Sequence, residues 1–167
     1  MAFVLTNKDS QSAKMHAKGE SAEISNPVSD NWNSLRSWLL PSQLDFLSKN
    51  KHAEYPQKIF EIGDCVILDD RAETQTRDIR KLAVTVSDVR VGYENISSVL
   101  HAFMKSIGCR FSLKEKLYPF LIDGRSAEIV INGKPSGFVG EIHPAILKNW
   151  GLQKAVVVFE VDTELLK

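Results

Sequence analysis

The feature that most constrains the fold is a pair of strand patterns, SAEIVINGKPSGFVGEI (residues 126–142), joined by an Asn-Gly pair. Asn-Gly is typical of the tight turns between antiparallel strands, because both residues tolerate positive φ angles. The apolar run AVVVFEV (155–161) predicts a final strand, and only a short helix pattern separates it from the hairpin. Consecutive strands with few helices between them favour an α+β fold with an antiparallel sheet.

The rest of the chain predicts further elements. We expect strands over residues 2–6, 58–68, 81–87 and 109–117, and helices over residues 41–50, 94–108 and 144–150. The mixed-charge run over residues 69–78 is typical of a solvated hairpin connection, although a loop that meets a nucleotide or RNA is the alternative. The polar stretch over residues 7–20 shows no apolar periodicity.

Three of these patterns also predict which side chains share a face. In the strand over residues 58–68, one face carries Phe60, Ile62, Val66 and Leu68, and the other carries Glu61, Gly63 and Cys65. In the helix over residues 94–108, the residues at helical spacing are Ile96, Val99, Leu100, Phe103 and Ile107. In the helix over residues 41–50, Leu44 and Leu47 are expected to point inward.

Length and composition fit one globular domain over residues 1–167, since 43% of the residues are hydrophobic and 25% are charged. Lys plus Arg and Asp plus Glu both number 21, which excludes a broad basic footprint for nucleic acid and leaves room only for a local basic patch. The first residues lack the pattern of a secretion signal, and no apolar run is long enough for a membrane helix. We therefore expect a cytoplasmic protein whose Cys65 and Cys109 are reduced.

His143 and Glu141 form the first candidate site. Two residues apart on a strand, they could share a face and act as an acid/base or metal pair. The alternative, which we favour, is structural: Pro144 begins a helix and His143 leads the chain into it. No second ligand or nucleophile stands at a motif spacing, so the sequence predicts no metal site and no catalytic residue.

A second candidate is the cluster Asp123, Arg125 and Glu128, beside an Asp-Gly turn. These side chains could contact a phosphate or an amino acid, but a turn with a surface ion pair is the simpler interpretation. The tryptophans could stack on bases, although packing in a core or an interface is the safer assignment for Trp32, Trp38 and Trp150.

Four segments, taken together and in order, resemble a known family. They are ISNPVS…LRSWLLPSQLDFL, YPQKIFEIGDCV, GRSAEIVINGKPSGFVGEIHPAILKNWGL and VVVFEVD, and together they span nearly the whole chain. This set resembles the C-terminal catalytic-like module of the phenylalanyl-tRNA synthetase beta subunit, of the archaeal/eukaryotic type. The resemblance implies a class II aminoacyl-tRNA synthetase-like fold, with the rest of a beta chain expected before Met1.

The same resemblance implies partners and cofactors for the complete enzyme. In this family two alpha and two beta chains form a heterotetrameric ligase of protein biosynthesis. The alpha subunit activates phenylalanine with ATP and Mg²⁺ and charges tRNA(Phe). No cofactor is expected in this chain itself, which would act as a pseudo-catalytic, structural partner of alpha.

The residues at the family's catalytic motifs support this expectation. The strand that should end in an ATP-binding arginine offers Cys65, Val66, Ile67 and Leu68, none of which is cationic. In the last strand, Glu160 and Asp162 stand where small or cationic residues are wanted, and carboxylates would repel a triphosphate unless a metal ion intervened.

The resemblance also implies a vestigial ligand pocket, because the segment around Tyr118, Pro119 and Phe120 resembles the part of alpha that lines the phenylalanine site. The side chains expected to line such a pocket are Glu61, Tyr118, Phe120, Arg125, Glu128 and His143. The main rival hypothesis is a stand-alone small-molecule-binding or regulatory domain that uses this pocket. An autonomous enzyme using Glu141 and His143 is the third possibility. For a structural module we also expect an exposed apolar patch, and the chain could self-associate without its partner.

Overall fold

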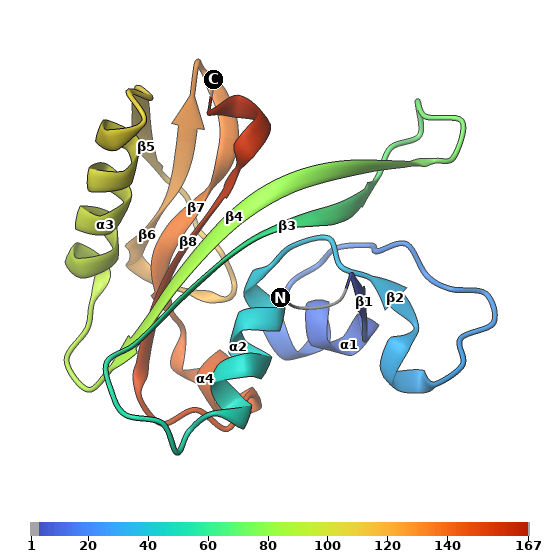
Figure 1. Cartoon of the computed structure of the whole chain (residues 1–167), viewed down its shortest axis with the longest axis horizontal. Coiled ribbons are helices and arrows are strands. Elements are labelled where there is room, and N and C mark those ends of the chain that lie inside the picture. Colours follow the sequence, from blue (N-terminus) through green and yellow to red (C-terminus); the bar gives the residue numbers. More distant parts are fainter. Residues whose placement is uncertain (1–3, 167) are drawn as a thin grey trace.

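The computed structural model describes residues 4–166 and is built around one six-stranded antiparallel sheet (Figure 1). The strands lie in the order β3-β4-β8-β7-β6-β5. Their bounds are β3 (Gln57–Leu68), β4 (Thr76–Asp88), β5 (Phe111–Glu115), β6 (Leu121–Ile131), β7 (Lys134–Ile142) and β8 (Ala155–Asp162). Every neighbouring pair is antiparallel, which confirms the predicted α+β class. The last strand, β8, is inserted between β4 and β7, and this explains why its sequence is almost wholly apolar.

Helices cover both faces of this sheet. Helix α3 (Tyr93–Ser106) packs on one face, and α2 (Leu40–Lys49) and α4 (Pro144–Asn149) pack on the other. Along β8 the side chains alternate accordingly, because Val157 belongs to the core under α3 and Val158 to the core under α2 and α4. We call these the α3 face and the α2 face of the sheet.

The residues before α2 form a smaller layer beside the β3–β4 ribbon (Figure 1). Its elements are β1 (Leu5–Thr6), α1 (Lys8–Gln11), the 3-10 helices η1 (Ala13–Met15) and η2 (Asp30–Trp32), and β2 (Ser34–Leu35). The strand predicted over residues 2–6 is seen as β1, and residues 2 and 3 lie outside the described residues. The polar stretch over residues 7–20 contains α1, whose first turn Asn7 caps, and a buried Met15. Local capping and two buried side chains, those of Met15 and Gln11, therefore organise a segment that has no apolar periodicity.

Several predicted turns and ends are confirmed. Asn132 and Gly133 adopt positive φ angles of 51° and 75° at the β6–β7 hairpin. Gly108, at φ 70°, follows the end of α3. The 69–78 run does form the β3–β4 connection, but β4 already begins at Thr76, before the predicted residue 81.

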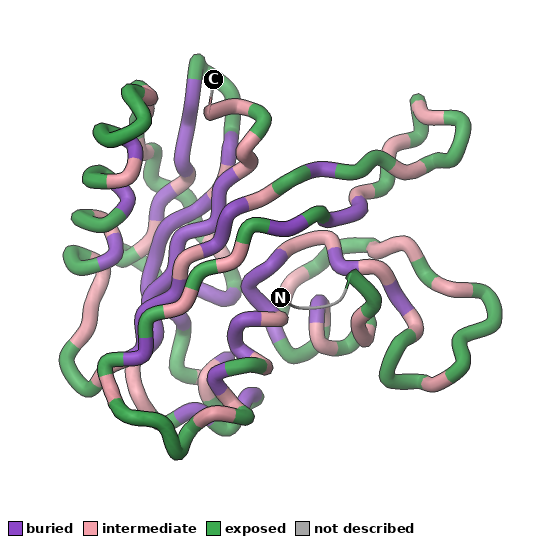
Figure 2. Tube along the Cα trace, in the orientation of Figure 1, coloured by how far each residue is buried: buried purple, intermediate pink, exposed green. Residues whose placement is uncertain are grey.

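The inward face of α3 differs in part from the prediction. Ile96 and Leu100 are buried as expected, whereas Val99 and Ile107 are exposed and Met104 is buried in their place (Figure 2). The helix presents a narrow stripe at four-residue spacing to β7 and β8. Beside this stripe, Phe103 is partly buried against the core, whereas Val99 and Ile107 remain exposed.

The structure shows which face of β3 is buried, a choice that the sequence pattern left open. Phe60 is 74% exposed and Ile62 is 56% exposed, whereas Gly63 and Cys65 on the other face are buried. The reason lies in what covers each face. Cys65 packs against Leu39 on the α2 face, while α3 lies over β7 and β8 and does not reach this edge strand.

Candidate functional site

Three glutamates stand in one row across the α2 face of the sheet. The strand registers pair Glu61 with Ala83, Ala83 with Glu160, Glu160 with Phe138, and Phe138 with Glu128. Residues paired across antiparallel strands point to the same face, so these side chains lie side by side. This glutamate row, Glu61, Glu160 and Glu128, is the candidate site, and it contains two of the six residues predicted to line a pocket.

Arg36 neutralises the first member of the row. Its guanidinium is 2% exposed, and Nη1 donates a hydrogen bond to Glu61 Oε1 at 2.9 Å. Arg36 Nε donates to the backbone oxygen of Asp64 at 2.9 Å. A Cβ added at Gly63 would lie 2.2 Å from Arg36 Nη2, so the strand needs a glycine where the guanidinium crosses it. Glu61, Gly63 and the backbone of Asp64 therefore bind Arg36 of the same chain.

Glu160 is the most deeply buried member of the row, with 1% of its surface exposed. Its Oε2 accepts hydrogen bonds from the backbone N–H groups of Leu39 and Leu40, both at 3.0 Å, at the start of α2. The Nζ of Lys81 lies 3.3 Å from Oε1 as an ion pair without hydrogen-bond geometry. A carboxylate at a helix N-terminus is favourable because the free N–H groups carry partial positive charge. Glu160 therefore anchors α2 to the sheet.

Lys116 pairs with the third member, Glu128. The hydrogen bond from Lys116 to this carboxylate raises the pKa of the ammonium group. Lys116 also lies 5.3 Å from the ring centroid of Tyr118, and burial raises the pKa of the Tyr118 phenol. All three glutamates in the row therefore have a cationic partner from the same chain.

Aromatic rings pack together on the same face. Trp38 and Phe120 meet edge to face with ring centroids 4.9 Å apart, and Phe138 lies 5.1 Å from Phe120. Tyr118 joins them at 5.4 Å from Phe120. These rings belong to the core under α2 and α4 or pack against it. Three of the six predicted pocket residues, Tyr118, Phe120 and Glu128, thus lie close together on the α2 face.

The structure places Arg125 and His143 elsewhere. Arg125 Nη1 lies 3.1 Å from Oε2 of Glu141, and Glu141 pairs in register with Val157, whose side chain lies in the core on the α3 face. This ion pair is therefore on the opposite face from the glutamate row. His143 follows the end of β7, is exposed, and accepts a hydrogen bond at Nδ1 from the N–H of Ala145 at 3.1 Å. His143 is therefore the N-cap residue of α4, as the structural interpretation of the sequence predicted.

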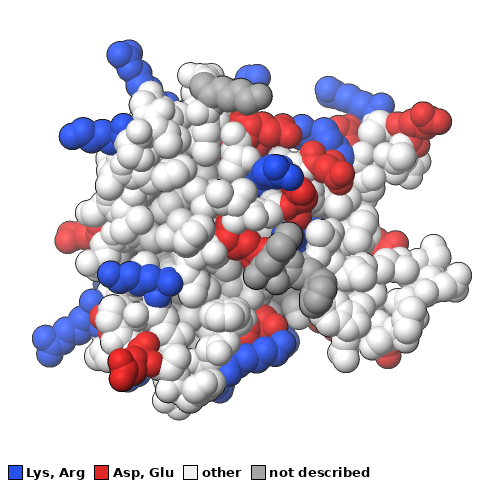
Figure 3. Space-filling model, viewed as in Figure 1, with Lys and Arg blue, Asp and Glu red and all other residues white. Residues whose placement is uncertain are grey.

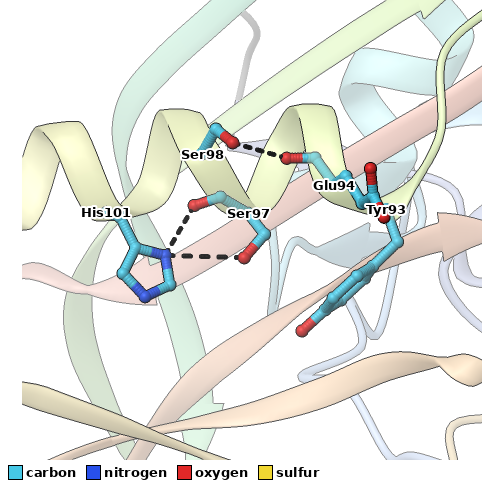
Figure 4. A pocket seen from close by; sticks show the side chains of 5 residues that line it. All are labelled: Tyr93, Glu94, Ser97, Ser98 and His101. Atoms are coloured by element: carbon cyan, nitrogen blue, oxygen red, sulfur yellow. Dashed lines mark hydrogen bonds between the residues drawn. The ribbon is translucent and has the colours of Figure 1, made fainter.

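A shallow depression of about 450 Å³ lies on the outer side of α3 (Figure 4). Its lining residues are Tyr93, Glu94, Ser97, Ser98 and His101. The His101 Nδ1 is bonded to the backbone oxygen of Ser97 at 2.8 Å, and Ser98 Oγ donates to the backbone oxygen of Glu94 at 2.8 Å. These polar groups satisfy the helix's own carbonyls, and none of the six predicted pocket residues lines the depression.

Sequence reasoning missed the cations of the row. Gly63 inside a strand pattern was a usable signal, since an isolated glycine there often marks the close approach of another group. Nothing local identified Arg36 or Lys81 as partners of the glutamates.

Within residues 4–166, no group of three or more His, Cys, Asp or Glu side chains is arranged to hold a metal ion. None of the described helices is long and apolar enough to cross a membrane.

Comparison with known proteins supplies the family. A family model described as the phenylalanyl tRNA synthetase beta chain CLM domain matches residues 1–163. The phenylalanine–tRNA ligase beta subunit of Thermococcus kodakarensis is 41% identical over 96% of this chain and 31% of its own length. The beta subunit of Pyrococcus abyssi is 43% identical over 96% of this chain and 29% of its own length. The beta subunit of Korarchaeum cryptofilum is 42% identical over 91% of this chain and 28% of its own length. The chain thus spans about a third of the length of these relatives.

Proposed function

We propose a structural function from one premise: the chain belongs to the phenylalanyl-tRNA synthetase beta chain CLM domain family. In this proposal, residues 1–167 form the single C-terminal, class II synthetase-like module of a phenylalanine–tRNA ligase beta subunit. The module carries out no chemistry. It supports an alpha subunit that activates phenylalanine with ATP and Mg²⁺ and charges tRNA(Phe), within a cytoplasmic heterotetramer.

The observation that carries this proposal is the glutamate row. Formation of an aminoacyl adenylate places charge on phosphoryl oxygens, and cationic groups must be free to stabilise that charge. On this face the described cations Arg36, Lys81 and Lys116 are each paired with a glutamate of the row. Cys65, where a phosphate-binding arginine would be needed, is buried against Leu39. The site is therefore suited to holding α2 in place, and poorly suited to holding a triphosphate.

A second feature supports a structural partner. The apolar strip formed by Phe60 and Ile62 is exposed on the edge strand β3. Apolar side chains grouped on an otherwise polar surface are typical of the core of a protein–protein interface. In the proposed complex this strip packs against the alpha subunit.

The test uses the full beta subunit co-expressed with alpha. Replacing Phe60 and Ile62 together by Asp should weaken assembly by at least about tenfold, since burying either side chain contributes about 1.5–3 kcal/mol. The control is Leu117→Asp, because Leu117 is 68% exposed on the segment after β5. Size-exclusion chromatography over a range of concentrations measures the assembled fraction.

Activity provides the other half of the test. The chain alone should show no phenylalanine-dependent exchange of pyrophosphate into ATP, while the assembled enzyme should. Exchange by the isolated chain would overturn the pseudo-catalytic proposal. A wild-type beta subunit that does not associate with alpha would overturn the structural one.

A further inference from the structure

A group of lysines without carboxylate partners surrounds the C-terminal end of α4. We call Lys14, Lys51, Lys148 and Lys154 the α4 lysine surface. None of them takes part in any of the ion pairs of the described residues. The cations of the glutamate row, in contrast, are each paired with a carboxylate of the chain. The α4 lysine surface is a local group of positive charges in a chain whose formal net charge is zero.

Contacts with the end of α4 place these lysines together. Lys14 Nζ lies 4.6 Å from the ring centroid of Trp150. Lys51 Nζ donates to the backbone oxygen of Gly151 at 3.3 Å. Lys148 is in the last turn of α4, and its backbone oxygen accepts from the N–H of Gly151 at 3.0 Å. Three segments far apart in sequence thus bring a lysine to the same few residues.

The neighbouring residues keep the charge positive. Lys154 Nζ lies 5.9 Å from the ring centroid of Tyr55, in the loop that also carries Lys51. Residues 14–18, 51–55 and 148–154 contain five lysines, two histidines and one acidic residue, Glu54. The partial negative charge at a helix C-terminus accounts for cations such as Lys51 and Lys148, but Lys14 and Lys154 rest on aromatic rings instead.

A shallow depression of about 340 Å³ lies beside Lys148. Its lining residues are Pro144, Leu147, Lys148, Gly151, Leu152 and Gln153. Three of them are apolar and Lys148 stands among them. Gly151, to whose backbone oxygen Lys51 donates, lines the same hollow, so two lysines of the surface border it.

We propose that the α4 lysine surface contacts the phosphodiester backbone of RNA. This inference rests on the proposed function, in which the complete enzyme handles tRNA. Lysine ammonium groups act as mobile point charges that bind phosphate without reading bases. Recognition is therefore by charge, and the affinity falls as the salt concentration rises, because releasing counterions into a more concentrated solution is less favourable. The surface adds affinity to a partner that other parts of the enzyme select.

The test measures binding of a fluorescently labelled tRNA(Phe) transcript to this chain by anisotropy, at several KCl concentrations. Lys14, Lys51 and Lys148 are replaced together by Gln. The matched control replaces Lys105, Lys114 and Lys134 by Gln, three exposed lysines that also lack an ion pair among the described residues. Both triple variants lose the same charge. Circular dichroism checks that each remains folded.

The α4 triple variant should bind roughly 10-fold more weakly. The slope of its plot of log K against log[KCl] should also be shallower by about 2, because each lost phosphate contact reduces the magnitude of that slope by about 0.7–0.9. The control should stay within about twofold of the wild type. Equal weakening in both variants, or wild-type affinity in the α4 variant, would overturn the proposal. The measurement needs no alpha subunit, so its outcome is separate from the assembly test of the proposed function.

Discussion

Replacing Glu160 by Ala tests whether the carboxylate in the middle of the row holds α2 against the sheet. The substitution leaves two buried backbone N–H groups, those of Leu39 and Leu40, without the acceptor that now lies 3.0 Å from each. It also leaves Lys81 largely buried without its carboxylate. Because Glu160 is 1% exposed, bulk solvent does not reach these groups in the folded chain.

The magnitude follows from these contacts. Hydrogen bonds to a charged group contribute about 1.5–3 kcal/mol each, and an orphaned buried partner adds its desolvation cost. We expect Glu160→Ala to lower the free energy of unfolding by about 3–5 kcal/mol, and Tm by roughly 10 °C. Glu160→Gln should cost only about 1–2 kcal/mol, since its amide oxygen can still accept from the start of α2.

Urea unfolding followed by circular dichroism measures these differences, with Glu164→Ala as the control. Glu164 is half exposed in η3 (Thr163–Leu165), and its ion pair with Arg77 is 3.7 Å long, so the control should change stability by less than about 0.5 kcal/mol. Glu160→Ala within about 1 kcal/mol of the wild type would refute the anchoring of α2 by Glu160. Equal losses for Ala and Gln would show that the negative charge beside Lys81, and not the acceptor oxygen, is what matters.

Other substitutions probe single features. Gly63→Ala should cost about 2–3 kcal/mol because its Cβ would lie 2.2 Å from Arg36 Nη2, whereas Gly19→Ala, with nothing within 4 Å, should change urea stability by less than about 0.5 kcal/mol. Burial raises the pKa of Cys65 to about 12, so iodoacetamide at pH 8 should label it only after unfolding. Rapid labelling of Cys65 in the folded chain, distinguished from the partly buried Cys109 by peptide mass spectrometry, would contradict this. His143→Ala should cost about 0.5–1 kcal/mol and His143→Asn should restore it, because Asn also caps helices; a loss that Asn does not restore would point to another function for the imidazole.

Elements with local signals were predicted closely from sequence. Helix α2 begins one residue before the expected Pro41, and α4 begins at the expected Pro144. The β6–β7 hairpin follows from Asn132 and Gly133, whose positive φ angles are a property of those residue types. In each case a few adjacent residues determine the backbone, so no knowledge of the remainder of the fold is needed.

The candidate site could not be predicted in the same way, because it is made of long-range pairs. Glu160 accepts from Leu39, which lies 121 residues earlier, and Arg36 reaches Glu61 across 25 residues. The sequence identified Glu160 as unsuited to ATP but gave no sign that it caps a helix. Strand order decides these contacts, and strand order depends on which faces can be covered together.

The outward orientation of Phe60 and Ile62 on β3 and the pairing of Glu61 with Arg36 have one physical cause. Arg36 lies against the strand on the α2 face, where it needs Glu61 as its partner and Gly63 as the space it crosses. Side chains alternate along a strand, so placing these two residues inward turns Phe60 and Ile62 outward. Removing one member of a buried ion pair costs about 3–5 kcal/mol, which is of the same size as the about 1.5–3 kcal/mol that burying each of the two apolar side chains would contribute. The exposed strip that we propose as the alpha contact is thus a direct consequence of the ion pair that occupies the site.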